Sequence, residues 1–201
     1  MVSGKTRDAM LTIIDFALRS IEIISDEEKN RFIDTLIEAS KTGRKIFVVG
    51  AGRSGLVAKA FAMRLLHLVF NVYVIGETIL TKSSPGDILV AISGSGQTKL
   101  VVSAAEVAKS VGVRVVAITT YPDSPLGKLA DIVVRVPGRT KSAREDDYVS
   151  RQILGMHEPL APLGTLFEDT LLVFLDGVIA ELMEKLGVSE EDLRNRHANI
   201  E

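Results

Sequence analysis

The sequence has 201 residues, of which 46% are hydrophobic and 25% are charged. This composition is that of an ordinary globular domain and excludes an intrinsically disordered chain. With 24 Lys and Arg against 26 Asp and Glu, the formal net charge is −2, so we expect no overall attraction to nucleic acid or to an anionic membrane. The absence of Cys excludes disulfides, thiolate metal sites and cysteine nucleophiles.

The first part of the chain reads as two helices followed by a strand. Helical spacing of apolar residues predicts a helix over residues 6–24. A second helix is expected from Ser25, because Ser25 followed by Glu28 matches a capping box, and Gly43 suits its end. Residues 45–49 form a short apolar run that ends at a glycine, which is typical of a strand buried on both faces.

From residue 54 onward, helical and strand patterns alternate. The predicted segments are a helix at 54–69, strands at 72–75 and 87–92, a helix at 98–111, a strand at 114–119, a short helix at 125–130, a strand at 132–136 and a long helix at 165–186. Five strands mostly separated by helices indicate an α/β fold, a three-layer αβα arrangement with a doubly wound parallel sheet in the flavodoxin-like order 2-1-3-4-5.

The whole chain, residues 1–201, reads as a single domain. Its N-terminal helices are expected at about 5–42, the sheet core at about 45–136 and the C-terminal helices at about 164–197. Charged residues interrupt the longest apolar stretches, so no membrane span is expected. The N-terminus carries charges of both signs and lacks the layout of a signal peptide, which predicts a soluble cytoplasmic protein.

A glycine-rich turn at residues 50–55, Gly-Ala-Gly-Arg-Ser-Gly, joins the first strand to a helix. Backbone N–H groups at a helix start suit an anion, and Arg53 and Ser54 add a charge and a hydroxyl. The turn also matches the dinucleotide fingerprint, with Glu77 about where the ribose-binding acid would lie. A tight turn without a ligand is the third interpretation.

A second turn at residues 93–98, Ser-Gly-Ser-Gly-Gln-Thr, follows the third strand and also precedes a helix. In the order 2-1-3-4-5 the first and third strands are neighbours, so both turns would flank one crevice at the carboxyl ends of the strands. Two donor-rich helix starts facing one crevice suit a compact phosphate better than an extended dinucleotide. The residues therefore favour a phosphate ester, although Ser and Gly are common in any such turn.

These two turns, together with the strand that ends at Gly76 and Glu77, resemble the sugar isomerase (SIS) domain family over about residues 30–186. Residues 162–168 (Pro-Leu-Gly-Thr-Leu-Phe-Glu) and 196–201 (Arg-His-Ala-Asn-Ile-Glu) are similar to the 6-phospho-3-hexuloisomerases. The resemblance implies interconversion of D-arabino-hex-3-ulose 6-phosphate and fructose 6-phosphate, without a cofactor, in a homotetramer. It also implies a role in carbohydrate metabolism, in formaldehyde fixation through the ribulose monophosphate pathway.

The resemblance also implies roles for individual residues. Glu168 would be the catalytic carboxylate, and His197 a catalytic histidine supplied by a neighbouring subunit. The residues expected to bind the sugar phosphate are Ser54, Ser93, Ser95 and Thr98, with Gly52, Arg53, Gly94, Gly96 and Gln97 completing the cradle.

Moving a carbonyl between C3 and C2 requires a base and hydrogen-bond donors for an enediolate, but no redox cofactor. Glu168 shares a helical face with Leu171, Leu172 and Leu175, and a carboxylate on an apolar face is either partnered or raised in pKa. Alternatively, Thr165 and Glu168 match a capping box, in which Glu168 only bonds the helix start. Asp169 and Asp176 read as a solvated face or a subunit contact.

The three histidines lie far apart in the sequence and show no metal-ligand spacing, so no metal site is expected. His67 lies in an apolar helix and reads as a core or interface residue. His157, in an irregular stretch after residue 137, could approach the site, but His197 is preferred on the resemblance. The charged run at residues 139–147 could be a lid, a subunit contact or a solvated loop.

Three other functions remain open at this point. The chain could be another SIS-type isomerase, acting on arabinose 5-phosphate or sedoheptulose 7-phosphate. It could be a phosphosugar sensor without activity, or an NAD enzyme on the first glycine turn alone. The helix at 165–186 is apolar nearly all round, which indicates burial on most sides and a subunit interface.

Overall fold

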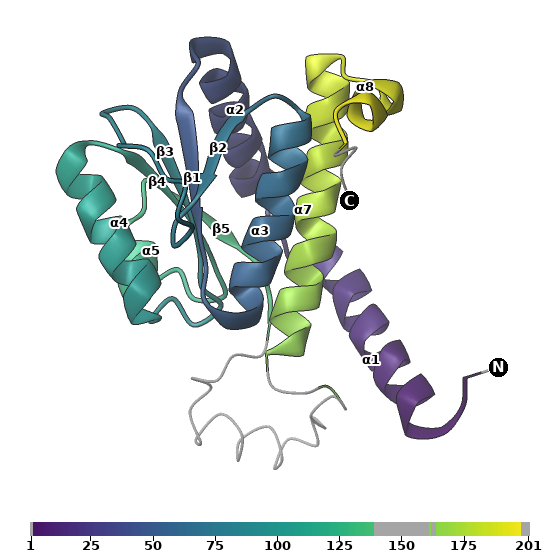
Figure 1. Cartoon of the computed structure of the whole chain (residues 1–201). Helices are drawn as coiled ribbons and strands as arrows, with labels where there is room; N and C mark the ends of the chain where they lie inside the picture. Colours follow the sequence, from purple (N-terminus) through teal and green to yellow (C-terminus); the bar gives the residue numbers. More distant parts are fainter. Residues whose placement is uncertain (1, 139–160, 162–163, 198–201) are drawn as a thin grey trace.

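Five parallel strands form the centre of the molecule (Figure 1). The computed structural model describes residues 2–138, 161 and 164–197. The strands are β1 (Lys45–Val49), β2 (Asn71–Val74), β3 (Ile88–Ile92), β4 (Arg114–Thr119) and β5 (Ile132–Arg135). Their order across the sheet is β2-β1-β3-β4-β5, which confirms the predicted flavodoxin-like order.

Helices cover both faces of the sheet. One face carries α2 (Asp26–Thr42), α3 (Gly52–His67) and α7 (Thr165–Leu186), and the other carries α4 (Lys99–Val111) and α5 (Pro125–Leu129). Two further helices are α1 (Gly4–Ile21) and the short α8 (Glu190–Asn195). The predicted three-layer α/β fold is therefore confirmed.

Alternating side chains along the strands build two hydrophobic cores. In β1, Ile46 and Val48 are buried with α2, α3 and α7, whereas Phe47 and Val49 are buried with α4 and α5. Because a central parallel strand is covered on both faces, it reads in the sequence as a continuous apolar run. This is why the strands could be placed from sequence within a residue or two.

The start of α2 differs in one detail from the sequence expectation. The Ser25 hydroxyl accepts a hydrogen bond from the Glu28 backbone N–H at 3.4 Å, as a helix cap does. The Glu28 carboxylate, however, accepts a hydrogen bond from the backbone N–H of Arg135 at 2.7 Å. It therefore ties α2 to the end of β5 and does not complete a capping box.

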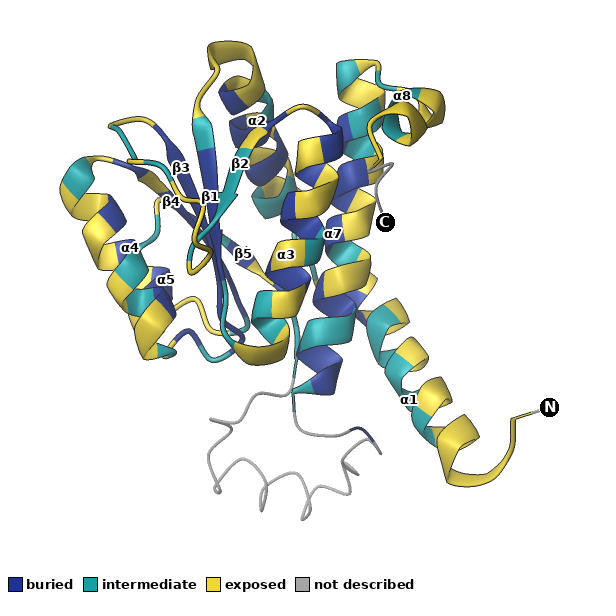
Figure 2. Cartoon of the chain, viewed as in Figure 1, coloured by how far each residue is buried: buried dark blue, intermediate teal, exposed yellow. Residues whose placement is uncertain are grey.

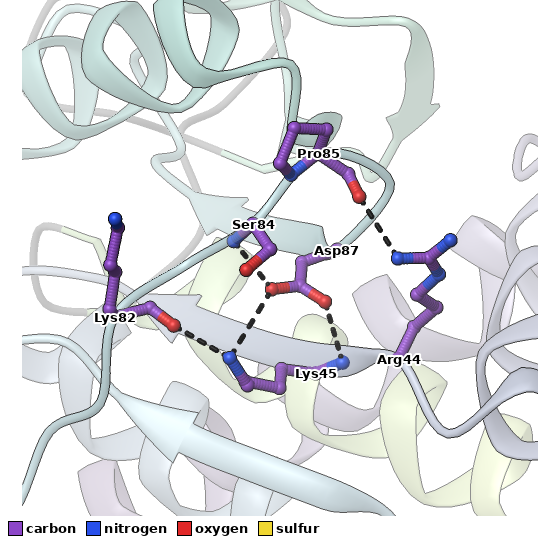
Figure 3. Close-up of polar contacts among 6 residues, drawn as sticks. All are labelled: Arg44, Lys45, Lys82, Ser84, Pro85 and Asp87. Atoms are coloured by element: carbon purple, nitrogen blue, oxygen red, sulfur yellow. Dashed lines mark hydrogen bonds and ion pairs between the residues drawn. The ribbon is translucent and has the colours of Figure 1, made fainter.

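Buried Asp87 organises the edge of the sheet at which the strands begin (Figure 3). Its carboxylate accepts hydrogen bonds from the backbone N–H of Lys45 at 3.0 Å and of Ser84 at 2.8 Å. The Lys45 ammonium lies 3.9 Å from the same carboxylate and donates to the Lys82 carbonyl at 2.7 Å. Asp87, expected within a strand, thus precedes β3 and satisfies N–H groups that the ladder leaves open.

The N-terminal helix α1 extends away from the body of the molecule (Figure 2). Ser20 is its single buried residue, and apolar side chains such as Ile14 and Leu18 are more than half exposed. Among the helices that the structure describes, none combines the length and the apolar character needed to cross a membrane.

Candidate functional site

The two glycine-rich turns follow β1 and β3, which are neighbours in the sheet. Val49 at the end of β1 is in register with Ala91, one residue before the end of β3. Both turns therefore lie at the carboxyl edge of the sheet, the edge at which open α/β sheets bind ligands.

Two of the three glycines in the first turn are required by its own packing. A Cβ on Gly50 would lie 2.8 Å from the Ser54 carbonyl oxygen, and one on Gly55 would lie 3.0 Å from the Gly50 oxygen. The first and last glycines of the G-x-G-x-x-G pattern are thus explained without a dinucleotide. Glu77, expected as the ribose acid in the dinucleotide interpretation, forms an ion pair with Lys59. These two residues help to line a pocket of about 240 Å³ beside this turn.

The hydroxyl groups of the second turn form hydrogen bonds with other groups of the same turn. Ser93 is buried, and its Oγ lies 2.9 Å from the Thr98 Oγ1. Ser95 Oγ accepts a hydrogen bond from the Gln97 backbone N–H at 3.2 Å. Ser95 and Thr98 are half-buried and Gln97 is exposed, so a ligand can reach these three residues.

Gly96 anchors this turn against the start of α5. Its φ is +62°, and an added Cβ would lie 1.9 Å from the Ser124 Oγ. Its carbonyl accepts a hydrogen bond from the Leu126 backbone N–H at 3.0 Å. Only glycine fits this conformation and this contact.

Arg53 connects the first turn to the start of α7, more than a hundred residues later in the chain. Its Nε lies 3.1 Å from Glu168 Oε2, and its Nη2 lies 3.1 Å from Asp169 Oδ1. Its Nη1 donates to the Thr165 Oγ1 at 3.0 Å. The Glu168 side chain is only 13% exposed, so the structure brings a shielded carboxylate to the turn predicted to bind phosphate.

The capping-box alternative for Glu168 is wrong. Gly164, at φ +91°, takes the N-cap position, and Thr165 is the first helical residue. The Thr165 hydroxyl accepts from Arg53, and the Glu168 carboxylate lies over Gly164, where an added Cβ would be 3.2 Å from Oε1. The carboxylate therefore faces Arg53 and the turn.

His197 lies at the other end of α3, the helix that begins at the first turn. Its ring centroid is 5.3 Å from that of His67, the last residue of α3. Arg53 and His67 are about 20 Å apart along a helix of this length. Within one chain His197 is therefore not brought to Glu168. Burial, and then the nearby His197 and Arg64, hold the pKa of His67 below its usual value.

Some expected features lie outside the described residues, namely His157 and the charged run at 139–147. Within residues 2–138 and 164–197, no group of three or more His, Cys, Asp or Glu is placed to hold a metal ion.

The sequence analysis did not assign Thr165 or Asp169 to the site. Their spacing from Glu168 could have indicated them, because residues 165, 168 and 169 share one helical face.

The sequence profile of the SIS domain family matches residues 40–152, more than half of the chain. The chain belongs to this family. A protein of Aeropyrum pernix is 64% identical over 96% of this chain and 91% of its own length. The 3-hexulose-6-phosphate isomerase of Bacillus subtilis is 40% identical over 98% of this chain and 100% of its own.

Among solved structures, a Methanococcus jannaschii protein has a TM-score of 0.75 to this chain. A molecular function of 3-hexulose-6-phosphate isomerase was inferred for that protein. It is 33% identical, with 98% of each chain covered. The resemblance noted from the sequence, to the SIS family and within it to the hexuloisomerases, is therefore confirmed.

Proposed function

We propose that this protein is a 6-phospho-3-hexuloisomerase that interconverts D-arabino-hex-3-ulose 6-phosphate and fructose 6-phosphate. The observation that carries the proposal is the shielded Glu168 carboxylate, held through Arg53 at a sheet edge lined by two hydroxyl-rich turns. The relatedness to named hexulose-phosphate isomerases over nearly the whole chain supports this choice of substrate.

The second turn supplies most of the phosphate cradle in this proposal. Ser95, Thr98 and Gln97 are accessible donors above buried Ser93. Backbone N–H groups at the start of α4 add partial positive charge. The remaining members are Gly52 and Ser54 of the first turn and Gly94 and Gly96 of the second.

Glu168 acts as the base. It takes the proton from C2 of the 3-ketose, the C–H electron pair forms the C2–C3 double bond, and the C3 oxygen becomes an oxyanion. A proton then moves from the C2 hydroxyl to the C3 oxygen, and Glu168 returns its proton to C3. The hydrogen count is unchanged, so the reaction needs no redox cofactor, and none is proposed.

His197 assists the proton transfer between the two oxygens, and it comes from a second copy of the chain. Its position at the far end of α3 from Arg53 supports a contribution in trans. Exposed apolar surfaces support an assembly, a homotetramer on the family resemblance. These surfaces lie on α1, on the outer face of α3 and on the side of α4.

The proposed activity belongs to formaldehyde fixation through the ribulose monophosphate pathway, or to pentose phosphate supply in reverse. In this proposal the protein is a single SIS domain that acts in the cytoplasm.

The experiment is a turnover assay with a substrate panel. The 3-hexulose 6-phosphate is made in place from formaldehyde and ribulose 5-phosphate by a separate synthase, and fructose 6-phosphate is measured as it forms. We expect turnover with this substrate and little with arabinose 5-phosphate or sedoheptulose 7-phosphate.

Turnover confined to one of the other sugars would replace the substrate but keep the reaction class. Tight calorimetric binding of fructose 6-phosphate without any turnover would favour a sensor. Binding of NADH would favour the dinucleotide interpretation.

A further inference from the structure

All the contacts described for the guanidinium of Arg53 are with residues in the first turns of α7. Its three nitrogens each contact a different residue, with Nε at Glu168, Nη1 at Thr165 and Nη2 at Asp169, at 3.0–3.1 Å. A guanidinium is a rigid planar fork, so three such contacts fix both its place and its orientation. Arg53 was expected in the phosphate cradle, but its contacts point to the base.

Two of these contacts do not depend on Glu168. Thr165 is buried and Asp169 is partly exposed, and the two flank Glu168 on one helical face. Together they hold the guanidinium beside the base even if the Glu168 carboxylate changes its charge. Arg53 in turn offsets the repulsion between the adjacent carboxylates of Glu168 and Asp169.

The guanidinium retains donors for a substrate. It has five N–H groups, and the hydrogen bonds to Thr165 and Asp169 use one on Nη1 and one on Nη2, which leaves a second N–H on each of these two nitrogens. Half of the side chain is exposed. A base within about 3 Å of a carbon-bound proton lies close to the oxygen on the next carbon as well. A guanidinium 3.1 Å from Glu168 Oε2 is thus within reach of that oxygen.

We propose that Thr165 and Asp169 are positioning residues that hold Arg53 at the reacting end of the sugar, beside Glu168, and not at its phosphate. This inference rests on the proposed isomerase function. As Glu168 takes the C2 proton and the C3 oxygen gains negative charge, the remaining N–H groups of Arg53 donate to that oxygen. Asp169 acts only through Arg53.

The test compares Asp169→Asn, Asp169→Glu, Arg53→Gln and the double variant Asp169→Asn/Arg53→Gln. The readouts are kcat and KM with 3-hexulose 6-phosphate and calorimetric titration with inorganic phosphate. We expect Asp169→Asn to lower kcat about 10-fold or more, while KM and the phosphate Kd stay within about 2-fold. Asp169→Glu restores most of kcat, and Asp169→Asn has no further effect in the Arg53→Gln background.

Asp176→Asn is the matched control, because Asp176 is an exposed aspartate two turns further along α7. It should leave kcat unchanged. Melting temperatures of all variants separate misfolding from a loss of catalysis.

Wild-type kcat in Asp169→Asn, or weaker phosphate binding in Arg53→Gln, would overturn the inference. If the wild-type protein does not turn over the hexulose phosphate, the proposed function fails. The phosphate titration then still decides whether Arg53 binds phosphate: an unchanged Kd in Arg53→Gln keeps Arg53 out of the phosphate cradle, and a weakened Kd overturns the inference.

Discussion

Gly96 in the second turn of the candidate site has almost no room for a side chain. It occupies the left-handed region at φ +62°, and an added Cβ would lie 1.9 Å from the Ser124 Oγ and 2.4 Å from the Ser124 Cβ. The first constraint is conformational and the second is steric. The two constraints can therefore be separated by mutating Ser124, which removes only the steric one.

Gly96→Ala should lower the free energy of unfolding by at least about 2 kcal/mol, since the left-handed conformation alone costs Ala about 1–2 kcal/mol and the clash adds to it. Binding of fructose 6-phosphate should weaken as well, because the turn carries Ser95 and Thr98. Denaturant unfolding and calorimetry measure the two effects.

Adding Ser124→Gly should recover part of the stability, because the next atom, Thr119 Oγ1, is 3.1 Å from the added Cβ. Ser124 caps α5 through the Gly127 N–H, but Gly is a tolerated cap. A fully stable Gly96→Ala protein would contradict the packing described for this turn.

Much of the candidate site could be predicted from local sequence, and its long-range contacts could not. The two turns were expected because strand, glycines and helix follow each other directly in the sequence. The contact between Arg53 and Glu168 joins residues 115 positions apart, and nothing in the local pattern of either residue specifies it. The capping-box alternative failed because Gly164 takes the N-cap place one residue earlier than the pattern indicates.

At the scale of secondary-structure elements, an aspartate directly precedes both β3 and β5. Asp87 binds the backbone N–H at the start of β1, and Asp131 accepts a hydrogen bond from the Val115 backbone N–H of β4 at 2.8 Å. Each carboxylate thus satisfies the first open donor of the neighbouring strand. Asp131 also forms an ion pair with Lys109 of α4.

Asp131 should make stability depend on acid pH. Its partial burial alone would raise the pKa, but the bonds from Lys109 and Val115 outweigh it and hold the pKa of Asp131 below its usual value. A carboxylate with a lower pKa in the folded state stabilises the fold above about pH 4, and this contribution is lost as the pH falls through the folded-state pKa.

Asp131→Asn should therefore be less stable than wild type at pH 7, by about 1 kcal/mol or less because the side chain is 37% exposed, and the difference should shrink at pH 3. Urea unfolding at the two pH values measures this. Asp123→Asn, an exposed aspartate in the turn before α5, is the control. A difference that grows toward pH 3 would contradict the sign.

The order of elements was predictable because each strand is a short apolar run, whereas the helices show apolar residues at helical spacing. The first and last residues of each strand and helix were harder to predict, since they depend on hydrogen-bond partners elsewhere in the chain. Asp87 reads as the start of a strand, yet its carboxylate caps β1, so β3 begins at Ile88. Glu28 likewise bonds the backbone of Arg135.

On the scale of the whole molecule, apolar side chains are exposed on both sides of the sheet. On one side lie Ile14 and Leu18 of α1 and Leu56 of α3, each more than half exposed. On the other lie Leu80, in the connection between β2 and β3, and Val107 of α4, which line one pocket. Two separate apolar surfaces suit two different contacts between copies, as in a tetramer with three twofold axes.

Mixing two inactive variants tests whether His197 acts in trans. In a mixed oligomer of Glu168→Gln and His197→Ala chains, some sites combine native Glu168 of one chain with native His197 of the other. We expect little activity from either variant alone and clear recovery after subunit exchange. No recovery in oligomers shown by mass to be mixed would place both residues in one chain or remove His197 from the site.

In the proposed mechanism Glu168 moves a proton between C2 and C3 of a sugar phosphate. The most direct measurement is proton NMR of fructose 6-phosphate in D2O with the wild-type protein and with Glu168→Gln. We expect that solvent deuterium enters at C3 over many turnovers with the wild type, and not with Glu168→Gln, whose amide cannot accept the proton. Equal exchange at C3, or undiminished interconversion, in a folded Glu168→Gln protein would rule out Glu168 as the base.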